Sequence, residues 1–158
     1  MRYRGWVIGA LLVLAATSAL ARDMTPRQVA DAYVAAWNAH DPDAAAALMA
    51  DDVTYLDATV GEPQKGREAA RDKVIKLLVT AAPDLTWTSE PIESANGIAY
   101  EWTFAGTNTG AWGPDSPATN KSFSFNGVTF MRVENGKITY QGDYYDSLGF
   151  QKQLGWIQ

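Results

Sequence analysis

The pattern of hydrophobic and polar positions changes once along the chain, near residue 85. Before this point apolar residues recur at helical spacing, and after it they alternate with polar ones as in half-buried strands. The first part predicts helices over 25–40, 43–50 and 66–83 and a strand over 52–58. The second part predicts strands over 85–95, 98–107, 121–133 and 137–146, followed by a short helix over 147–155.

The first predicted helix has a complete start signal. Thr25 is an N-cap residue, Pro26 occupies the first helical position, and Gln28 closes a capping box. Apolar and aromatic residues then follow at the spacing of one helix face. The members of this face are Val29, Tyr33, Ala36, Trp37 and His40. A long amphipathic helix with an aromatic inner face is therefore expected.

Two turn signals connect the predicted strands. Asn96-Gly97 separates the first pair and Asn135-Gly136 the last pair, and both dipeptides favour tight hairpins. Helices first and long hairpins afterwards predict an α+β domain. We expect a cone, in which a curved antiparallel sheet wraps around the long N-terminal helix. Its apolar interior, open at one end, is the expected place for a small-molecule site.

The N-terminal segment has the pattern of a secretory signal peptide. Arg2 and Arg4 precede an apolar run, and Ala19-Leu20-Ala21 resembles a cleavage site. The sequence thus predicts a signal peptide over 1–21, one domain over 22–158, and a periplasmic or secreted protein. An uncleaved anchor is the alternative, although the run is short for a membrane span. We expect no membrane contact after cleavage.

Charge and composition narrow the range of partners and chemistry. Cleavage would leave 11 basic side chains against 18 acidic ones, so a nucleic-acid partner is not expected. The chain has no cysteine and a single histidine, His40. A cysteine–histidine metal site and a Ser-His-Asp triad are therefore not predicted, and no glycine-rich phosphate loop occurs. We expect neither a metal nor another cofactor.

Two aspartates in the stretch "YQGDYYDSLGF" have different expected roles. Asp146 immediately precedes the last predicted helix, where its carboxylate can act as an N-cap. Alternation along the strand places Gln141, Asp143 and Tyr145 together on one face. Asp143 has no such capping role and is a candidate for chemistry, or alternatively a carboxylate at a solvated pocket mouth that is bonded to a tyrosine.

Asp57 is the stronger candidate for a general base. It ends a strand whose other inward residues are apolar. A carboxyl group in an apolar pocket has a raised pKa, which suits proton transfer near neutral pH. The alternative is an aspartate that only turns the chain before "GEP".

Large side chains on inward positions predict a wall for an apolar, ring-like ligand. Ordinary core packing is the alternative for any single member. The expected wall and its polar neighbours are Trp37, Trp87, Tyr100, Trp102, Phe125, Thr129, Met131, Gln141 and Tyr145.

The order of elements and several motifs resemble the NTF2-like superfamily. The segment "AYVAAWNAHDPDAAAALMADDVTYLDATVGEPQKG" is similar to the front end of ketosteroid isomerases. The segments "GTNTGAW", "PATNKSF" and "DYYDSLGFQKQLG" are similar to SnoaL-like polyketide cyclases. The resemblance implies that Asp57 shuttles a proton beside a carbonyl and that Tyr33 donates a hydrogen bond to the oxyanion. It also implies a homodimer formed through the outer face of the sheet, near Glu101, Thr103 and Thr139.

The chain departs from these families at several positions. Thr129 stands where the isomerase has a protonated aspartate, and Asn108 stands where cyclases often have histidine. Tyr100 and Trp102 stand where epoxide hydrolases of this fold need charged residues. Two hypotheses therefore remain open. The first is an exported, cofactor-independent acid–base enzyme, of isomerase or cyclase/lyase type, acting on a hydrophobic carbonyl compound. The second is a non-catalytic small-molecule-binding or accessory module.

Overall fold

The computed structural model describes residues 24–57, 61–94 and 97–158. The predicted signal peptide over 1–21 and the turn residue Asn96 lie outside the described residues. Among the described helices, none combines the length and the apolar character needed to cross a membrane.

Helix α2 (Pro26–Asn38) has the predicted capping box at its N-terminus. The backbone N–H of Gln28 donates to Thr25 Oγ1 at 3.2 Å, and the backbone N–H of Thr25 donates to Gln28 Oε1 at 2.9 Å. The inner face of the helix is buried from Val29 to Trp37. This helix carries Tyr33 and Trp37 into the interior of the domain.

A tight reversal follows α2. His40 adopts a left-handed backbone with φ of 55°, and Asp41 caps α3 (Pro42–Ala47). Strand β1 then runs from Met49 to Asp57. The short helix thus ends three residues before its predicted limit, and the strand begins earlier. Met49, predicted to be helical, is instead a fully buried strand residue.

The third predicted helix is present with an irregularity. Strand β2 (Gln64–Lys65) leads into α4 (Arg67–Ala70), a π-helical turn η1 (Arg71–Ile75) and α5 (Lys76–Ala81). These three segments form one continuous helix. Its buried residues include Val74 and Leu78, which face the sheet as the periodicity predicts.

The sheet has six strands in the order β2-β1-β6-β5-β4-β3. The long strands of the second half are β3 (Thr86–Ser94), β4 (Gly97–Thr107), β5 (Ser122–Glu134) and β6 (Lys137–Tyr145). They form consecutive antiparallel ladders.

The expectation of a fully antiparallel sheet is wrong at one ladder, because β1 and β6 run parallel. Short connections fix the antiparallel direction within the pairs β3–β4 and β5–β6, whereas most of the chain separates β1 from β6 and no local turn constrains them. The sheet is therefore mixed. This parallel ladder has a direct consequence for the candidate site.

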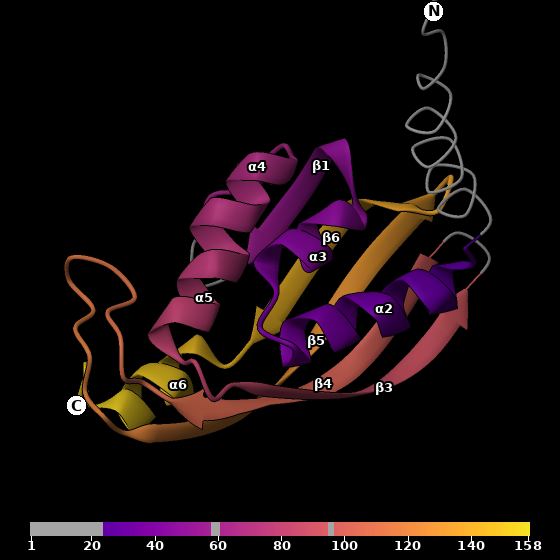
Figure 1. The fold of residues 1–158 in the computed structure, drawn as a ribbon. Coiled ribbons are helices and arrows are strands. Elements are labelled where there is room, and N and C mark those ends of the chain that lie inside the picture. The colour runs from indigo at the N-terminus through magenta and orange to yellow at the C-terminus, as the bar shows by residue number, and fades with distance from the viewer. Residues whose placement is uncertain (1–23, 58–60, 95–96) are drawn as a thin grey trace, which may run out of the picture.

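The helices α2 to α5 lie along one face of the curved sheet (Figure 1). Helix α2 packs mainly on β3 and crosses the concave side. Inward residues of the strands meet the helices in one continuous core, rich in aromatic side chains. The predicted cone is confirmed.

Helix α6 (Ser147–Leu154) closes one end of the sheet (Figure 1). Asp146 is its N-cap, as predicted, and its carboxylate accepts the backbone N–H of Gly149 at 2.8 Å. Phe150 and Leu154 are buried beneath the helix. The last predicted helix therefore seals the end of the cone with apolar side chains.

Candidate functional site

The candidate site is built around two buried carboxyl groups. Asp57 is the last residue of β1, and Asp143 lies near the end of β6. The parallel ladder pairs these two residues directly, so their side chains project to the same face of the sheet. Only 3% of Asp57 and 4% of Asp143 is exposed. Two acidic groups therefore share one apolar interior.

Asp143 accepts hydrogen bonds from three side chains. The Tyr55 hydroxyl donates to its Oδ2 at 2.7 Å, and the Thr129 hydroxyl donates to its Oδ1 at 2.6 Å. The amide of Gln141 reaches both oxygens, at 3.2 and 3.0 Å. These three donors come from β1, β5 and β6, and they fix the carboxyl group in one orientation.

The pKa of Asp143 is raised to about 7. Burial is the main cause, because an apolar environment disfavours the charged form, and the negative charge of Asp57 acts in the same direction. The hydrogen bonds from Thr129, Tyr55 and Gln141 oppose this shift by stabilising the carboxylate. The result is a carboxyl group that can gain or lose a proton at neutral pH.

Asp57 is held by an aromatic side chain from the end of β6. The Tyr145 hydroxyl donates to Asp57 Oδ1 at 2.9 Å. The Tyr145 ring stacks on Phe125, with ring centroids 4.8 Å apart. Asp57 and Asp143 are thus bonded to separate tyrosines, which gives the two carboxyl groups different surroundings.

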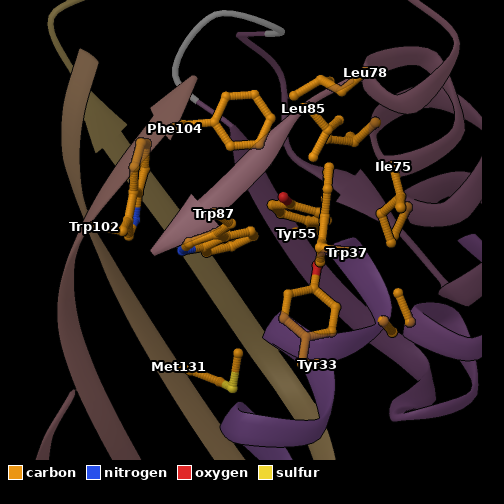
Figure 2. Close-up of a cluster of buried hydrophobic side chains, with 14 of the residues drawn as sticks. Tyr33, Trp37, Tyr55, Ile75, Leu78, Leu85, Trp87, Trp102, Phe104 and Met131 are labelled. Atoms are coloured by element: carbon orange, nitrogen blue, oxygen red, sulfur yellow. The ribbon is translucent and has the colours of Figure 1, made fainter. Parts of the chain in front are cut away.

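A cavity of about 20 Å³ lies between the two carboxyl groups and the aromatic wall, with room for about one water molecule. Figure 2 shows Trp37, Trp87, Trp102 and Phe104 gathered around this interior, with Tyr55 between Trp87 and Trp37. The lining residues are Trp37, Tyr55, Asp57, Leu78, Trp87, Trp102, Phe104, Phe125, Asp143 and Tyr145. Aromatic side chains fill most of the predicted ligand space.

A second cavity, of about 350 Å³, opens beyond Leu78. It lies between α5, α6 and the loop that joins β4 to β5, and its wall includes Trp112, Phe150 and Trp156. Leu78 lines both this outer cavity and the inner one. The outer cavity is large enough for a small ring compound, whereas the inner one is not.

Comparison with known proteins agrees with this architecture. The sequence model of the SnoaL-like polyketide cyclase family matches residues 27–154, which is most of the chain. The chain belongs to this family. No curated protein sequence matches the chain.

Several solved structures share the fold. TsrD from Streptomyces laurentii is 23% identical, with a TM-score of 0.72 over 83% of this chain and 95% of that one. A candidate polyketide cyclase from Pseudomonas putida KT2440 is 24% identical, with a TM-score of 0.72 over 82% and 98% of the two chains. A hypothetical protein from Catenulispora acidiphila with a ketosteroid isomerase-like fold, in complex with trimethylamine, is 26% identical. Its TM-score is 0.67 over 81% and 92%.

Within this SnoaL-like chain, the nine residues predicted to bind a ligand fall into two groups. Trp37, Trp87, Trp102, Phe125 and Tyr145 line the inner cavity. A second group is buried but is not part of the lining: Tyr100, Thr129, Met131 and Gln141. Thr129 and Gln141 act instead on Asp143, as donors to its carboxyl group.

Tyr33, predicted to hold an oxyanion, is fully buried but does not line the cavity. Its ring makes edge contacts with Trp37 and Trp87, at centroid distances of 6.2 and 6.0 Å. Burial raises the pKa of its hydroxyl strongly, and the charge of Asp143 adds to the effect. The geometry thus places Tyr33 in the layer behind the cavity wall.

Sequence reasoning missed Tyr55 and Phe104 as site residues. Each had a usable signal. Tyr55 lies two positions before Asp57 in the same strand, and Phe104 lies two positions after Trp102. Alternation places each of them on the same face as its partner.

Asn108, at the position where cyclases often have histidine, anchors a loop. Its side chain donates to Pro117 O and Thr119 Oγ1, both at 3.3 Å, and accepts from Trp112 Nε1 at 3.2 Å. Its backbone carbonyl accepts from Thr119 and Asn120. Asn108 therefore shapes the wall of the outer cavity through Trp112.

The described side chains contain no group of three or more His, Cys, Asp or Glu residues arranged to hold a metal ion. His40 is bonded to a backbone carbonyl, with its Nε2 at 2.8 Å from Leu85 O. Asp57 and Asp143, with their bonded tyrosines, are thus the groups in the inner cavity that could move a proton.

Proposed function

We propose that this protein is an acid–base enzyme of the isomerase or cyclase/lyase type, which acts without a cofactor on a small hydrophobic carbonyl compound. The observation that carries the proposal is the buried Asp143, whose pKa of about 7 is set by an apolar environment and by Asp57 beside it. A base with a pKa near the working pH combines a useful ionised fraction with a useful proton affinity.

In the proposed mechanism, ionised Asp143 removes a proton from the carbon next to the substrate carbonyl. The C–H electron pair moves into the C–C bond and charge develops on the carbonyl oxygen. Asp143 then returns the proton to another carbon or to the oxygen. Because Asp143 is buried, its carboxylate is a stronger base than it would be in solution.

Donors for the developing oxyanion are available in the wall of the cavity. Trp37 Nε1 and Trp87 Nε1 are buried and make no hydrogen bond to any described residue. Both side chains line the inner cavity. A buried, unpaired N–H group is costly, and a ligand oxygen would satisfy it. We assign these indoles to the carbonyl oxygen of the substrate.

The substrate must displace side chains to reach the carboxyl groups, because the inner cavity holds about one water molecule. Leu78 separates it from the outer cavity. We propose that the body of the ligand occupies the outer cavity and that its carbonyl end enters past Leu78. An apolar, ring-like ligand fits the aromatic wall formed by Trp112, Phe150 and Trp156.

The direct test is deuterium exchange beside the carbonyl of cyclic ketones such as 2-tetralone, followed by NMR in D₂O. Asp143→Asn should reduce the protein-catalysed rate by about 10²- to 10⁴-fold, the usual contribution of a general base. Asp146→Asn is the matched control, because Asp146 belongs to the same stretch but caps a helix. Equal rates in Asp143→Asn and the parent protein would contradict the proposal.

The second candidate is a binding module for a small organic ammonium ion. Seven aromatic residues and two carboxyl groups line the inner cavity, and aromatic cages bind methylated ammonium groups through cation–π contacts. The relative from Catenulispora acidiphila, 26% identical, was solved with trimethylamine. Calorimetric titration with trimethylammonium tests this candidate, with tert-butanol as a neutral ligand of similar shape. Equal affinity for both compounds would contradict it.

We further propose that the protein is exported and then cleaved after Ala21. The pattern at residues 1–21 supports this proposal. Mass spectrometry of protein recovered from the periplasm or medium should find Arg22 at the N-terminus. An intact N-terminus, or protein that stays in the cytoplasm, would contradict it.

We also propose a homodimer that uses the outer face of the sheet. Ile92, Phe130 and Tyr144 are large, exposed side chains on this face, and Glu101 and Thr103 lie beside a groove on it. Light scattering after size-exclusion chromatography should give twice the chain mass, and Phe130→Asp should reduce it to the monomer. A monomeric parent protein would contradict this proposal.

A further inference from the structure

Trp102 is linked to Asp143 through one intermediate hydroxyl. Its indole Nε1 donates to Thr129 Oγ1 at 2.8 Å, and Thr129 Oγ1 donates to Asp143 Oδ1 at 2.6 Å. An indole nitrogen can only donate, and a threonine hydroxyl carries a single hydrogen. Because an ionised carboxylate can only accept, the Thr129 hydrogen is directed to Asp143, while Trp102 occupies one of the two lone pairs of the Thr129 oxygen. With Asp143 ionised, the chain of hydrogen bonds therefore has a fixed direction.

The position of Trp102 is fixed by its neighbours. Gly127 is its direct partner in the ladder between β4 and β5, and a Cβ atom at that position would overlap the indole ring. The indole lies across this glycine and makes edge or tilted contacts with Trp87, Phe125 and Tyr145. The indole N–H is thereby held against Thr129, so the donor is preorganised.

We propose that Trp102 is a positioning residue for proton transfer. Through Thr129 it keeps Oδ1 of Asp143 as a hydrogen-bond acceptor, so the proton that Asp143 binds is placed on Oδ2. Oδ2 lies beside the Tyr55 hydroxyl. When Asp143 is ionised, Tyr55 donates to Oδ2. When Asp143 is neutral, the O–H bond is on Oδ2 and the Tyr55 oxygen accepts it.

The charges around Asp143 make this assignment testable by titration. The ionisable groups that act on it or respond to its charge are Asp57, Tyr33, Tyr55, Tyr100 and Tyr140. All four tyrosines have pKa values raised above the ordinary value, so they stay neutral near pH 7.

The effect of Trp102 on catalysis rests on the proposed function. Its effect on the protonation of Asp143 does not, because that effect can be tested without a substrate. Removing the indole N–H frees Thr129 to rotate and accept a proton from neutral Asp143, and it also weakens Thr129 as a donor to the carboxylate. Both effects favour the neutral form. The pKa of Asp143 should therefore rise when the N–H of residue 102 is lost.

The experiment is a pH titration of the Asp143 carboxyl carbon by ¹³C NMR in Trp102→Phe. We expect the pKa to rise by about 0.5 to 1 unit, the size of one net hydrogen bond. Trp87→Phe is the matched control, since it removes a buried indole from the same wall but one whose Nε1 has no hydrogen-bond partner among the described residues. Trp87→Phe should leave the pKa of Asp143 within about 0.2 unit of the parent value, a difference far below that of one hydrogen bond.

Two further variants separate the relay from changes in packing. Thr129→Val removes the intermediate hydroxyl, so adding Trp102→Phe to it should cause no further rise. Replacing Trp102 by β-(3-benzothienyl)alanine keeps the ring shape and substitutes sulfur for N–H, which serves if Trp102→Phe does not fold. The inference is overturned if the pKa is unchanged or lower in these Trp102 variants, if Trp87→Phe raises it equally, or if the rise persists beside Thr129→Val.

The titration of the Trp102 variants and the exchange assay of Asp143→Asn can fail independently of each other. Loss of exchange activity in Asp143→Asn together with an unchanged pKa in Trp102→Phe would support the enzyme and reject the relay. A raised pKa in Trp102→Phe without any exchange activity would support the relay and reject the enzyme. If activity is found, Trp102→Phe should also move the acidic limb of the pH profile of kcat/KM, which reports the ionisation of Asp143, to higher pH.

Discussion

Asp57 and Asp143 are direct partners in the parallel ladder between β1 and β6, and both side chains enter the same buried cavity. Like charges that share a buried site repel each other, so the protonation of Asp143 depends on the charge of Asp57. Because β1 and β6 come from opposite ends of the domain, the pair exists only in the folded protein.

Removing the charge of Asp57 should change Asp143 in a defined direction. The Asp57 carboxylate raises the pKa of Asp143, as the second cause after burial. In Asp57→Asn the pKa of Asp143 should therefore fall below about 7, because the repulsion is lost while burial remains. Carboxyl ¹³C titration of the variant measures this value. A pKa that stays constant or rises would show that the two groups are not coupled as the structure indicates.

The raised pKa of Asp143 should also appear in the pH dependence of stability. The folded-state pKa of about 7 lies above the ordinary aspartate value near 4, so the folded protein binds more protons between these pH values. This contribution to the free energy of unfolding is complete below about pH 4 and is lost as pH rises toward 7. Its slope within that window is about −1.4 kcal/mol per pH unit.

Denaturant titrations of the parent protein and of Asp143→Asn at pH 5, 6 and 7 isolate this slope. As pH rises from 5 to 7, the free energy of unfolding of the parent protein should fall relative to that of Asp143→Asn. Carboxyl groups that do not interact with Asp143 titrate alike in both proteins and cancel in the difference. A difference that does not vary with pH would contradict a raised pKa at Asp143.

Much of this arrangement follows from local sequence rules. The capping box at Thr25, the N-cap at Asp146 and the shared inward face of Gln141, Asp143 and Tyr145 all depend on neighbours along the chain. The parallel direction of β1 depends on no local turn, so the predicted antiparallel sheet was wrong there. The relative roles of Asp57 and Asp143 were equally unpredictable, because burial and donors from β1, β5 and β6 set the pKa of Asp143.

The cap at Asp146 provides a prediction on stability alone. Its carboxylate accepts the Gly149 N–H at 2.8 Å at the start of α6. Asp146→Ala should lower the free energy of unfolding by about 1 kcal/mol, whereas Asp146→Asn, which preserves capping ability, should change it far less. Denaturant unfolding at pH 7 measures both. If Asn and Ala were equally destabilising, the contribution would come from charge and not from the cap.

Gly127 is predicted to be intolerant of any side chain. A Cβ atom there would overlap the Trp102 ring, which contacts a packed aromatic wall and cannot move freely. Gly127→Ala should cost about 1–3 kcal/mol of stability, as overpacking of a core usually does. It should also shift the Trp102 indole N–H resonance. An unchanged resonance would show that the indole does not lie across this glycine.

The measurement that tests the central claim most directly is the carboxyl ¹³C titration of Asp143 in the unmodified domain. The structure predicts a pKa of about 7, since burial and the charge of Asp57 outweigh three hydrogen bonds to the carboxylate. An ordinary value near 4 would mean that Asp143 is solvated and cannot act as a base tuned to neutral pH. That result would contradict the proposed acid–base function.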